Sequence, residues 1–169
     1  MYIILIPIGL SILSIIVFFT KTGETSVIGK LFINLGLQKS DYNWLITDIE
    51  AYPQSQEFNN IINDKEYVVL STNELMNILN IEDFQWIWAV FSAIPSHYTI
   101  EEILKYELPC IQPLDEEYNH FGEEPKIQHP LAEIEIGAWD SSGMSIVTND
   151  NEVLEKFKVH YPLSKETFN

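Results

Sequence analysis

The chain has 169 residues, with 25 acidic side chains against nine lysines and no arginine, so its formal net charge is −16. A charge of this sign repels phosphates, which argues against binding DNA, RNA or anionic lipid head groups, and it favours a basic protein partner or bound cations. Four tryptophans and 46% hydrophobic residues also exclude a disordered acidic tail.

The first twenty residues contain no charged side chain. About 20 apolar residues in a helix cross a bilayer core of about 30 Å, so residues 1–20 predict a single transmembrane helix. One alternative is a buried core helix, but such a helix would keep a polar stripe that this run lacks. The other is a cleaved signal peptide, but the run has no basic residue at its start and no A-x-A cleavage site at its end. Lys21 and Lys30 follow it, which predicts an inner (cytoplasmic) membrane protein with a cytoplasmic C-terminal domain. Cys110, as the one cysteine, cannot form an internal disulfide, which agrees with that side.

The next segment, residues 21–40, is predicted to be juxtamembrane. Apolar spacing predicts a helix over residues 27–35, ended by Gly36, which either lies on the membrane or opens the soluble domain. Residues 41–169 then form an acidic domain, in which 24 acidic residues stand against six lysines, a formal charge of −18.

Five strands are predicted in this domain from β-branched and aromatic runs or from alternation of apolar and polar residues. Residues 84–93 form the most apolar of these runs and predict a central strand, on which Trp86 and Trp88 would share a core face. Glu133 and Glu135 would lie on the wet face of a later strand. The predicted strands are residues 43–51, 67–70, 84–93, 132–138 and 144–148.

Helices are predicted between the strands from apolar spacing and capping residues. Ser71 or Thr72 can cap one helix and Thr99 opens a capping box with Glu102, because their hydroxyls accept from unpaired backbone N–H groups. The predicted helices are residues 54–63, 71–79, 99–106 and 149–160. The fold class is therefore α+β, with a mixed, mostly antiparallel sheet of about five strands, packed helices and the N-terminal transmembrane helix.

A long loop, residues 107–130, carries four prolines and most of the candidate chemistry. Three hypotheses remain for it: a solvated acidic loop, a protein-binding loop, or a metal site in which Glu117 and His120, three residues apart, share a helical face with His129 nearby. The candidate partner-binding residues are Asp115, Glu116, Glu117, Glu123, Glu124 and Trp139, and the candidate metal ligands are Glu117, His120 and His129.

Catalytic motifs are not evident. Cys110 lies between Pro109 and Ile111, which fits a small buried residue better than a nucleophile, and Ser141 and Ser142 match no G-x-S-x-G turn. There is no glycine-rich phosphate loop, so no cofactor and no catalytic residue is predicted, and a non-enzymatic role is favoured.

The stretch from His129 to Ile136, continuing through residues 139–142 into a strand and a helix, is similar to small uncharacterised bacterial α+β proteins. Some proteins of this build resemble immunity proteins, which neutralise secreted bacterial toxins. The resemblance implies a small acidic domain that binds a basic toxin by charge and shape and carries no catalytic residues. The expected function is a membrane-anchored, acidic protein-binding domain; the alternative is a metal-dependent hydrolase using the His-containing loop.

Overall fold

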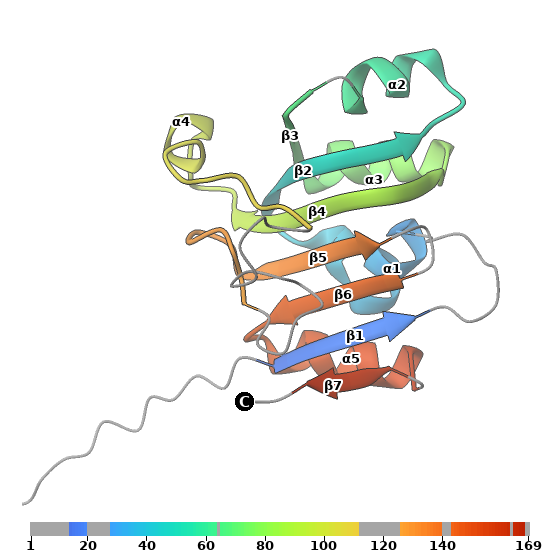
Figure 1. Cartoon of the computed structure of the whole chain (residues 1–169), viewed down its shortest axis with the longest axis vertical. Coiled ribbons are helices and arrows are strands. Elements are labelled where there is room, and N and C mark those ends of the chain that lie inside the picture. Colours follow the sequence, from blue (N-terminus) through green and yellow to red (C-terminus); the bar gives the residue numbers. More distant parts are fainter. Residues whose placement is uncertain are drawn as a thin grey trace, which may run out of the picture.

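The computed structural model describes residues 14–19, 28–63, 65–111, 126–139, 143–162 and 164–167. The fold is α+β, and its strands form one sheet in the order β3-β2-β4-β5-β6-β1-β7, with every neighbouring pair antiparallel (Figure 1). The five predicted strands are confirmed as β2 to β6, and β4 lies inside the sheet as expected. The strands are β1 Ser14–Phe19, β2 Tyr42–Tyr52, β3 Tyr67–Ser71, β4 Gln85–Pro95, β5 Ile134–Trp139, β6 Gly143–Thr148 and β7 Lys165–Thr167.

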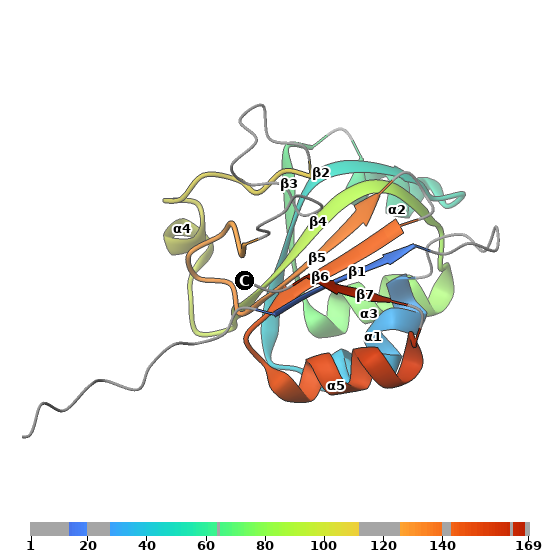
Figure 2. The same ribbon diagram turned by 60° about the horizontal axis from the view of Figure 1, so that its bottom comes forward.

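Three helices, α1, α3 and α5, cover one face of the sheet, whereas α4 lies apart from them (Figure 2). α1 carries Ile28, Leu31 and Phe32, all fully buried in the main core, so this helix belongs to the domain. Gly36 follows it with φ of 78°, the left-handed conformation that glycine adopts without strain. The helices are α1 Ile28–Leu35, the 3-10 turn η1 Leu37–Lys39, α2 Gln56–Ile62, α3 Thr72–Ile81, α4 Ile100–Ile103 and α5 Asn151–His160.

Aromatic side chains fill the core between these helices and the sheet. Phe32 lies 4.5 Å from Trp44 between ring centroids, and Trp86 lies 4.8 Å from Phe91 in an edge-to-face contact. Trp44 is fully buried and donates through Nε1 to Thr72 Oγ1 at 2.9 Å, which satisfies its one polar group. The core thus combines large apolar burial with a satisfied indole N–H.

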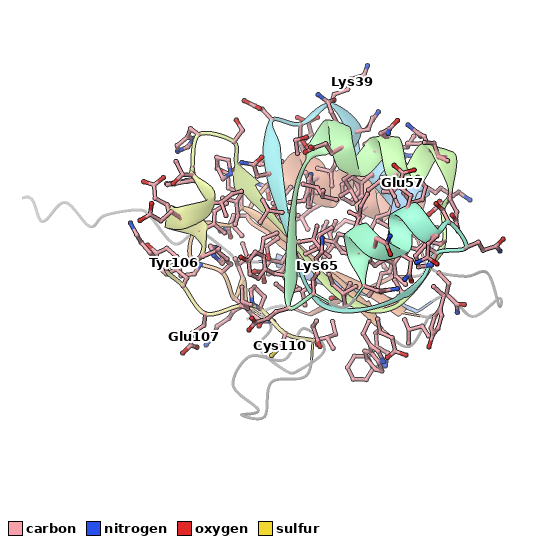
Figure 3. The ribbon with its side chains drawn as sticks, turned by 90° about the horizontal axis from the view of Figure 1, so that it is seen from above. Lys39, Glu57, Lys65, Tyr106, Glu107 and Cys110 are labelled. Atoms are coloured by element: carbon pink, nitrogen blue, oxygen red, sulfur yellow. The ribbon has the colours of Figure 1, made fainter. Side chains whose placement is uncertain are left out.

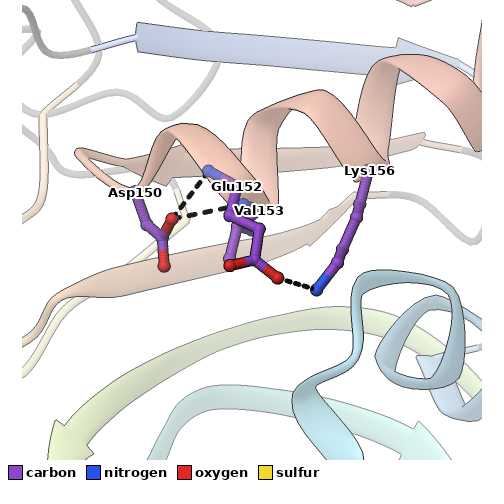
Figure 4. A network of polar contacts seen from close by, with 4 residues as sticks. All are labelled: Asp150, Glu152, Val153 and Lys156. Carbon is purple, nitrogen blue, oxygen red and sulfur yellow. Dashed lines mark hydrogen bonds and ion pairs between the residues drawn. The ribbon is translucent and has the colours of Figure 1, made fainter.

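The predicted helix starts are confirmed at their capping residues. Ser71 and Thr99 each form a complete capping box with the glutamate three residues on, although α4 ends at Ile103 and is shorter than predicted. Asp150 caps α5 by accepting from the backbone N–H groups of Glu152 and Val153 at 2.8 and 3.3 Å (Figure 4). These caps are local in sequence, and they satisfy donors that a helix cannot pair by itself.

The N-terminal segment differs from its prediction. Residues 14–19, inside the predicted membrane span, form β1, which pairs along its whole length with β6 and over three residues with β7. A helix is therefore wrong for these six residues. The remainder of the predicted span, residues 1–13 and 20, lies outside the described residues, and no helix in the described ranges has the length and apolarity to cross a membrane. Anchoring in a membrane stays a prediction.

Two irregularities interrupt the pairing of β2 with β4, on either side of Glu50. Asp48 lies in the first of them with φ of 51°, a conformation that aspartate tolerates better than most residues. The second changes the pairing by one residue, so that Glu50 faces Trp88 but Ala51 faces Trp86. The expectation that the two tryptophans share a core face is therefore wrong: Trp86 is fully buried in the main core, and Trp88 is not part of it.

Candidate functional site

The face of the sheet away from α1, α3 and α5, which we call the second face, is more polar than the helical face. Residues that alternate with the main core along β4 and β5 lie on it, among them Ser92, Glu135 and Trp139. Near α4 it carries a small apolar cluster built on Leu45, Ile94 and Ile103. We call residues 112–125 the acidic segment. The residues just before and just after this segment pack on the second face, so this face positions the two ends of the segment.

Glu135 is the centre of a buried network on the second face and has no exposed surface. Its carboxylate accepts from Ser92 Oγ at 3.0 Å, from the backbone N–H of Gln128 at 2.7 Å and from that of His129 at 2.8 Å. Hydrogen bonds to an ionised acceptor are strong, and they offset the cost of burying the charge. The sequence-based expectation of a solvent-facing Glu135 is wrong, because residues before the strand fold back over it.

Gln128 joins the two ends of the acidic segment directly. Its side-chain amide accepts from the backbone N–H of Cys110 at 2.9 Å and donates to the carbonyl of Cys110 at 2.8 Å. The amide thus pairs with one residue as a neighbouring strand would. The chain just before residue 112 and the chain just after residue 125 are therefore held next to each other.

The leading end of the segment is also fixed to β2. Thr47 Oγ1 donates to the carbonyl of Pro109 at 2.6 Å, and the backbone N–H of Ile111 donates to Asp48 Oδ2 at 2.8 Å. Thr47 is buried, and the irregularity in β2 turns Asp48 toward Ile111. Residues 112–125, which carry five carboxylates and no lysine, therefore start and end on a fixed base.

His129 is fully buried at this base, and both ring nitrogens are engaged. Nε2 lies 3.1 Å from the carbonyl of Ile103, which can only accept, so Nε2 carries the proton; Nδ1 accepts from the backbone N–H of Leu131 at 3.2 Å. The ring of Tyr106 contacts it edge to face. Burial lowers the pKa of His129, opposed by the hydrogen bond to Ile103 and by the charge of Glu135. A ring held in this way has no lone pair directed toward a metal.

This lowered pKa predicts a pH dependence of stability. Between the folded-state pKa and the unfolded value of about 6.5, the unfolded chain binds more protons, so the free energy of unfolding falls as pH decreases below about 6.5, by at most about 1.4 kcal/mol per pH unit. Urea unfolding at about pH 7.5, 6.5 and 5.5 measures this change. Glutamine keeps a hydrogen-bond donor but does not titrate. We expect His129→Gln to be less stable than the unmodified protein at neutral pH and to lose less of its free energy of unfolding on acidification. An equal loss in both proteins would contradict the role of His129.

Cys110 is half-buried and lines a cavity of about 310 Å³. The cavity is also lined by Tyr106, Glu107, Gln128 and others, and Figure 3 shows Tyr106, Glu107 and Cys110 on the side of the molecule away from Lys39. Burial and then the charge of Asp48 raise the pKa of the Cys110 thiol, which lowers its thiolate fraction. This environment is that of a structural cysteine, not of an activated nucleophile.

The proposed metal ligands are only partly described. Glu117 and His120 lie outside the described residues, and His129 is hydrogen-bonded as above. Within the described ranges, no group of three or more His, Cys, Asp or Glu side chains is arranged to hold a metal ion. The metal site stays a prediction for the undescribed residues.

The partner-binding candidates divide in the same way. Five of them, Asp115, Glu116, Glu117, Glu123 and Glu124, lie outside the described residues, and the structure describes the base that carries them. Trp139 is described: it is half-buried on the second face, and its ring is 4.8 Å from that of Trp88 at an interplanar angle of 75°. Sequence reasoning did not find Glu135, Gln128 or Asp48, because each acts through backbone groups distant along the chain.

Comparison of the chain with models of protein families, with curated proteins and with solved structures finds no match. The charge of the chain and the contacts described above are therefore the observations that bear on its function.

Proposed function

We propose that this protein is a non-enzymatic binding domain that presents residues 112–125 to a basic protein partner. The observation that supports this proposal most directly is that Gln128 and Cys110 hold both ends of the acidic segment together. These ends lie on the second face of the sheet. The resemblance to immunity proteins leads us to a basic toxin as the class of partner, and neutralisation as the outcome of binding.

Fixed ends favour binding for an entropic reason. A segment that must be ordered at the moment of association loses affinity, and restricting its ends before association reduces that cost. The bonds from Asp48 and Thr47 to the backbone at Ile111 and Pro109 supply this restriction without using the carboxylates of the segment. The restriction therefore comes from residues outside the segment.

The overall charge acts in the same direction. At a net charge of −16, long-range attraction raises the association rate of a basic protein, and this attraction weakens as salt shortens the screening length to about 8 Å near physiological ionic strength. Binding that depends on the segment is thus expected to be strong in low salt and to weaken as salt is added.

The test compares two variants with the same change in charge. In one, the five acids of the segment become amides: Asp115→Asn, Glu116→Gln, Glu117→Gln, Glu123→Gln and Glu124→Gln. In the matched control, five exposed acids elsewhere are replaced: Glu57→Gln, Glu66→Gln, Glu101→Gln, Glu152→Gln and Glu155→Gln. Binding of cytochrome c, as a defined basic protein, is measured by calorimetry in low and moderate salt.

We expect the segment variant to lose about tenfold in affinity, about 1.4 kcal/mol, and the control to lose clearly less. Equal losses would mean that only total charge matters, and the segment would not be the binding element. No binding of the basic protein by the unmodified chain in low salt would overturn the proposal as a whole. Pull-down from native extracts at both salt concentrations then identifies the natural partner.

A further inference from the structure

A row of side chains crosses three strands of the second face, at the end away from α4 and the Leu45, Ile94 and Ile103 cluster. Glu50 of β2 is paired with Trp88 of β4, which is paired with Trp139 of β5. Residues directly opposite each other in antiparallel strands point to the same face. Ala138, the neighbour of Trp139, belongs to the main core, so the row points away from α1, α3 and α5.

Tyr52 extends this row along β2. It follows Glu50 by two residues, so both lie on the same face, and its hydroxyl donates to Glu50 Oε1 at 3.3 Å. Tyr52 is 61% exposed, Glu50 is exposed, and Trp88 and Trp139 are half-buried. We call these four residues the aromatic row. Exposed tyrosine with half-buried tryptophans is the composition of binding hot spots, not of an ordinary solvated surface.

The ring geometry suits a cation. Trp88 and Trp139 meet edge to face, so their mutual contact uses one ring face and one ring edge. The faces of aromatic rings attract cations, tryptophan most strongly, and the Glu50 carboxylate next to Trp88 adds a full negative charge. A planar guanidinium can stack on an indole and donate to a carboxylate at once, which a lysine ammonium does less well.

The aromatic row also adjoins the anchored end of the acidic segment. Asp48, which holds the backbone of Ile111, is two residues before Glu50 on β2. The row is therefore close to the point at which residues 112–125 begin. Charge complementarity selects a basic occupant, because the chain as a whole is strongly acidic.

We propose that the aromatic row is a docking site for an arginine side chain of the basic protein partner. Glu50 accepts from the guanidinium, Trp88 and Trp139 provide the stacking surface, and Tyr52 orients Glu50. This inference rests on the proposed function, since it assigns to the partner an arginine at the point of contact.

The test uses oligoarginine and oligolysine peptides of the same length, with Kd measured at one salt concentration and tryptophan fluorescence recorded during titration. We expect the unmodified chain to bind oligoarginine about threefold or more tightly than oligolysine. We expect Glu50→Gln and Trp139→Phe to reduce this preference while the affinity for oligolysine changes little. Glu50 is exposed, so its replacement does not disturb folding. The variant with a neutralised segment should bind both peptides more weakly and keep the preference.

The outcomes separate the two proposals. Binding of both peptides with equal affinity, or an arginine preference that survives Glu50→Gln and Trp139→Phe, would overturn the aromatic row as an arginine site and leave the acidic segment intact. Failure to bind either peptide in low salt would overturn the binding function itself.

Discussion

Deletion of residues 1–20 is expected to destroy most of the stability of this domain. The deletion removes β1, which lies between β6 and β7 and pairs with both. Its loss leaves β7 without a neighbour and converts β6, whose residues are all buried, into an open edge. Unpaired strand edges bind other chains, so the truncated protein should also aggregate. Since domains of this size have only about 5–15 kcal/mol of stability, losing such a strand should cost several kcal/mol.

Denaturant unfolding and size-exclusion chromatography measure this effect, with deletion of residues 1–13 as the control that retains β1. The control should stay folded and monomeric. If deletion of residues 1–20 gives a monomer as stable as the full chain, β1 is not part of the sheet, and the segment would be available for the membrane span predicted from its apolarity. Fractionation of cells that express the full chain, with carbonate extraction of the membranes, then tests that span directly.

Replacement of Glu135 should be the most damaging point substitution on the second face. In Glu135→Gln, an NH₂ group replaces one carboxylate oxygen. This NH₂ group faces the backbone N–H of Gln128 or of His129, and two donors cannot form a hydrogen bond with each other. In Glu135→Ala these donors and Ser92 lose their acceptor altogether. An unpaired buried polar group costs about 1–3 kcal/mol, so we expect a loss of about 2–4 kcal/mol for Gln and more for Ala.

Urea unfolding at neutral pH measures this loss, and Glu155→Gln is the matched control. Glu155 is exposed on α5 and forms a surface ion pair with Lys158 at 3.4 Å, which is worth at most about 1 kcal/mol. Because Glu135 also holds the backbone at Gln128 and His129, its variants should weaken binding of a basic protein in step with their loss of stability. A Glu135→Gln protein as stable as the control would show that the buried network does not depend on the charge.

Local signals in the sequence predicted local features of the fold. The pairs Ser71 with Glu74 and Thr99 with Glu102 act within one helical turn, and five of the six described strands inside residues 41–169 were predicted from composition or alternation. β7, which is only three residues long, was not predicted. Residues 14–19 were misassigned because a short apolar run fits a membrane helix and a buried strand equally well by periodicity. Which of the two forms depends on β6 and β7, more than a hundred residues further along the chain.

The candidate site could be predicted only in its composition. The acidic segment is evident from its residues, but the base that holds it is made of side chains bonded to distant backbone, such as Asp48 to Ile111. Trp88 was placed in the core because strict alternation was assumed, whereas an irregular pairing beside Glu50 moves it to the opposite face. No property of a single segment encodes such a shift.

The position of β1 has a consequence for how the protein is made. β1 pairs only with β6 and β7, which lie more than a hundred residues further along the chain, so this part of the sheet cannot form until those residues have been synthesised. Pairings between distant parts of a chain form slowly, and partly folded chains with apolar segments exposed are prone to aggregate. β1 should therefore stay unpaired while the residues between it and β6 are synthesised, and a chaperone that covers it would raise the yield of folded protein.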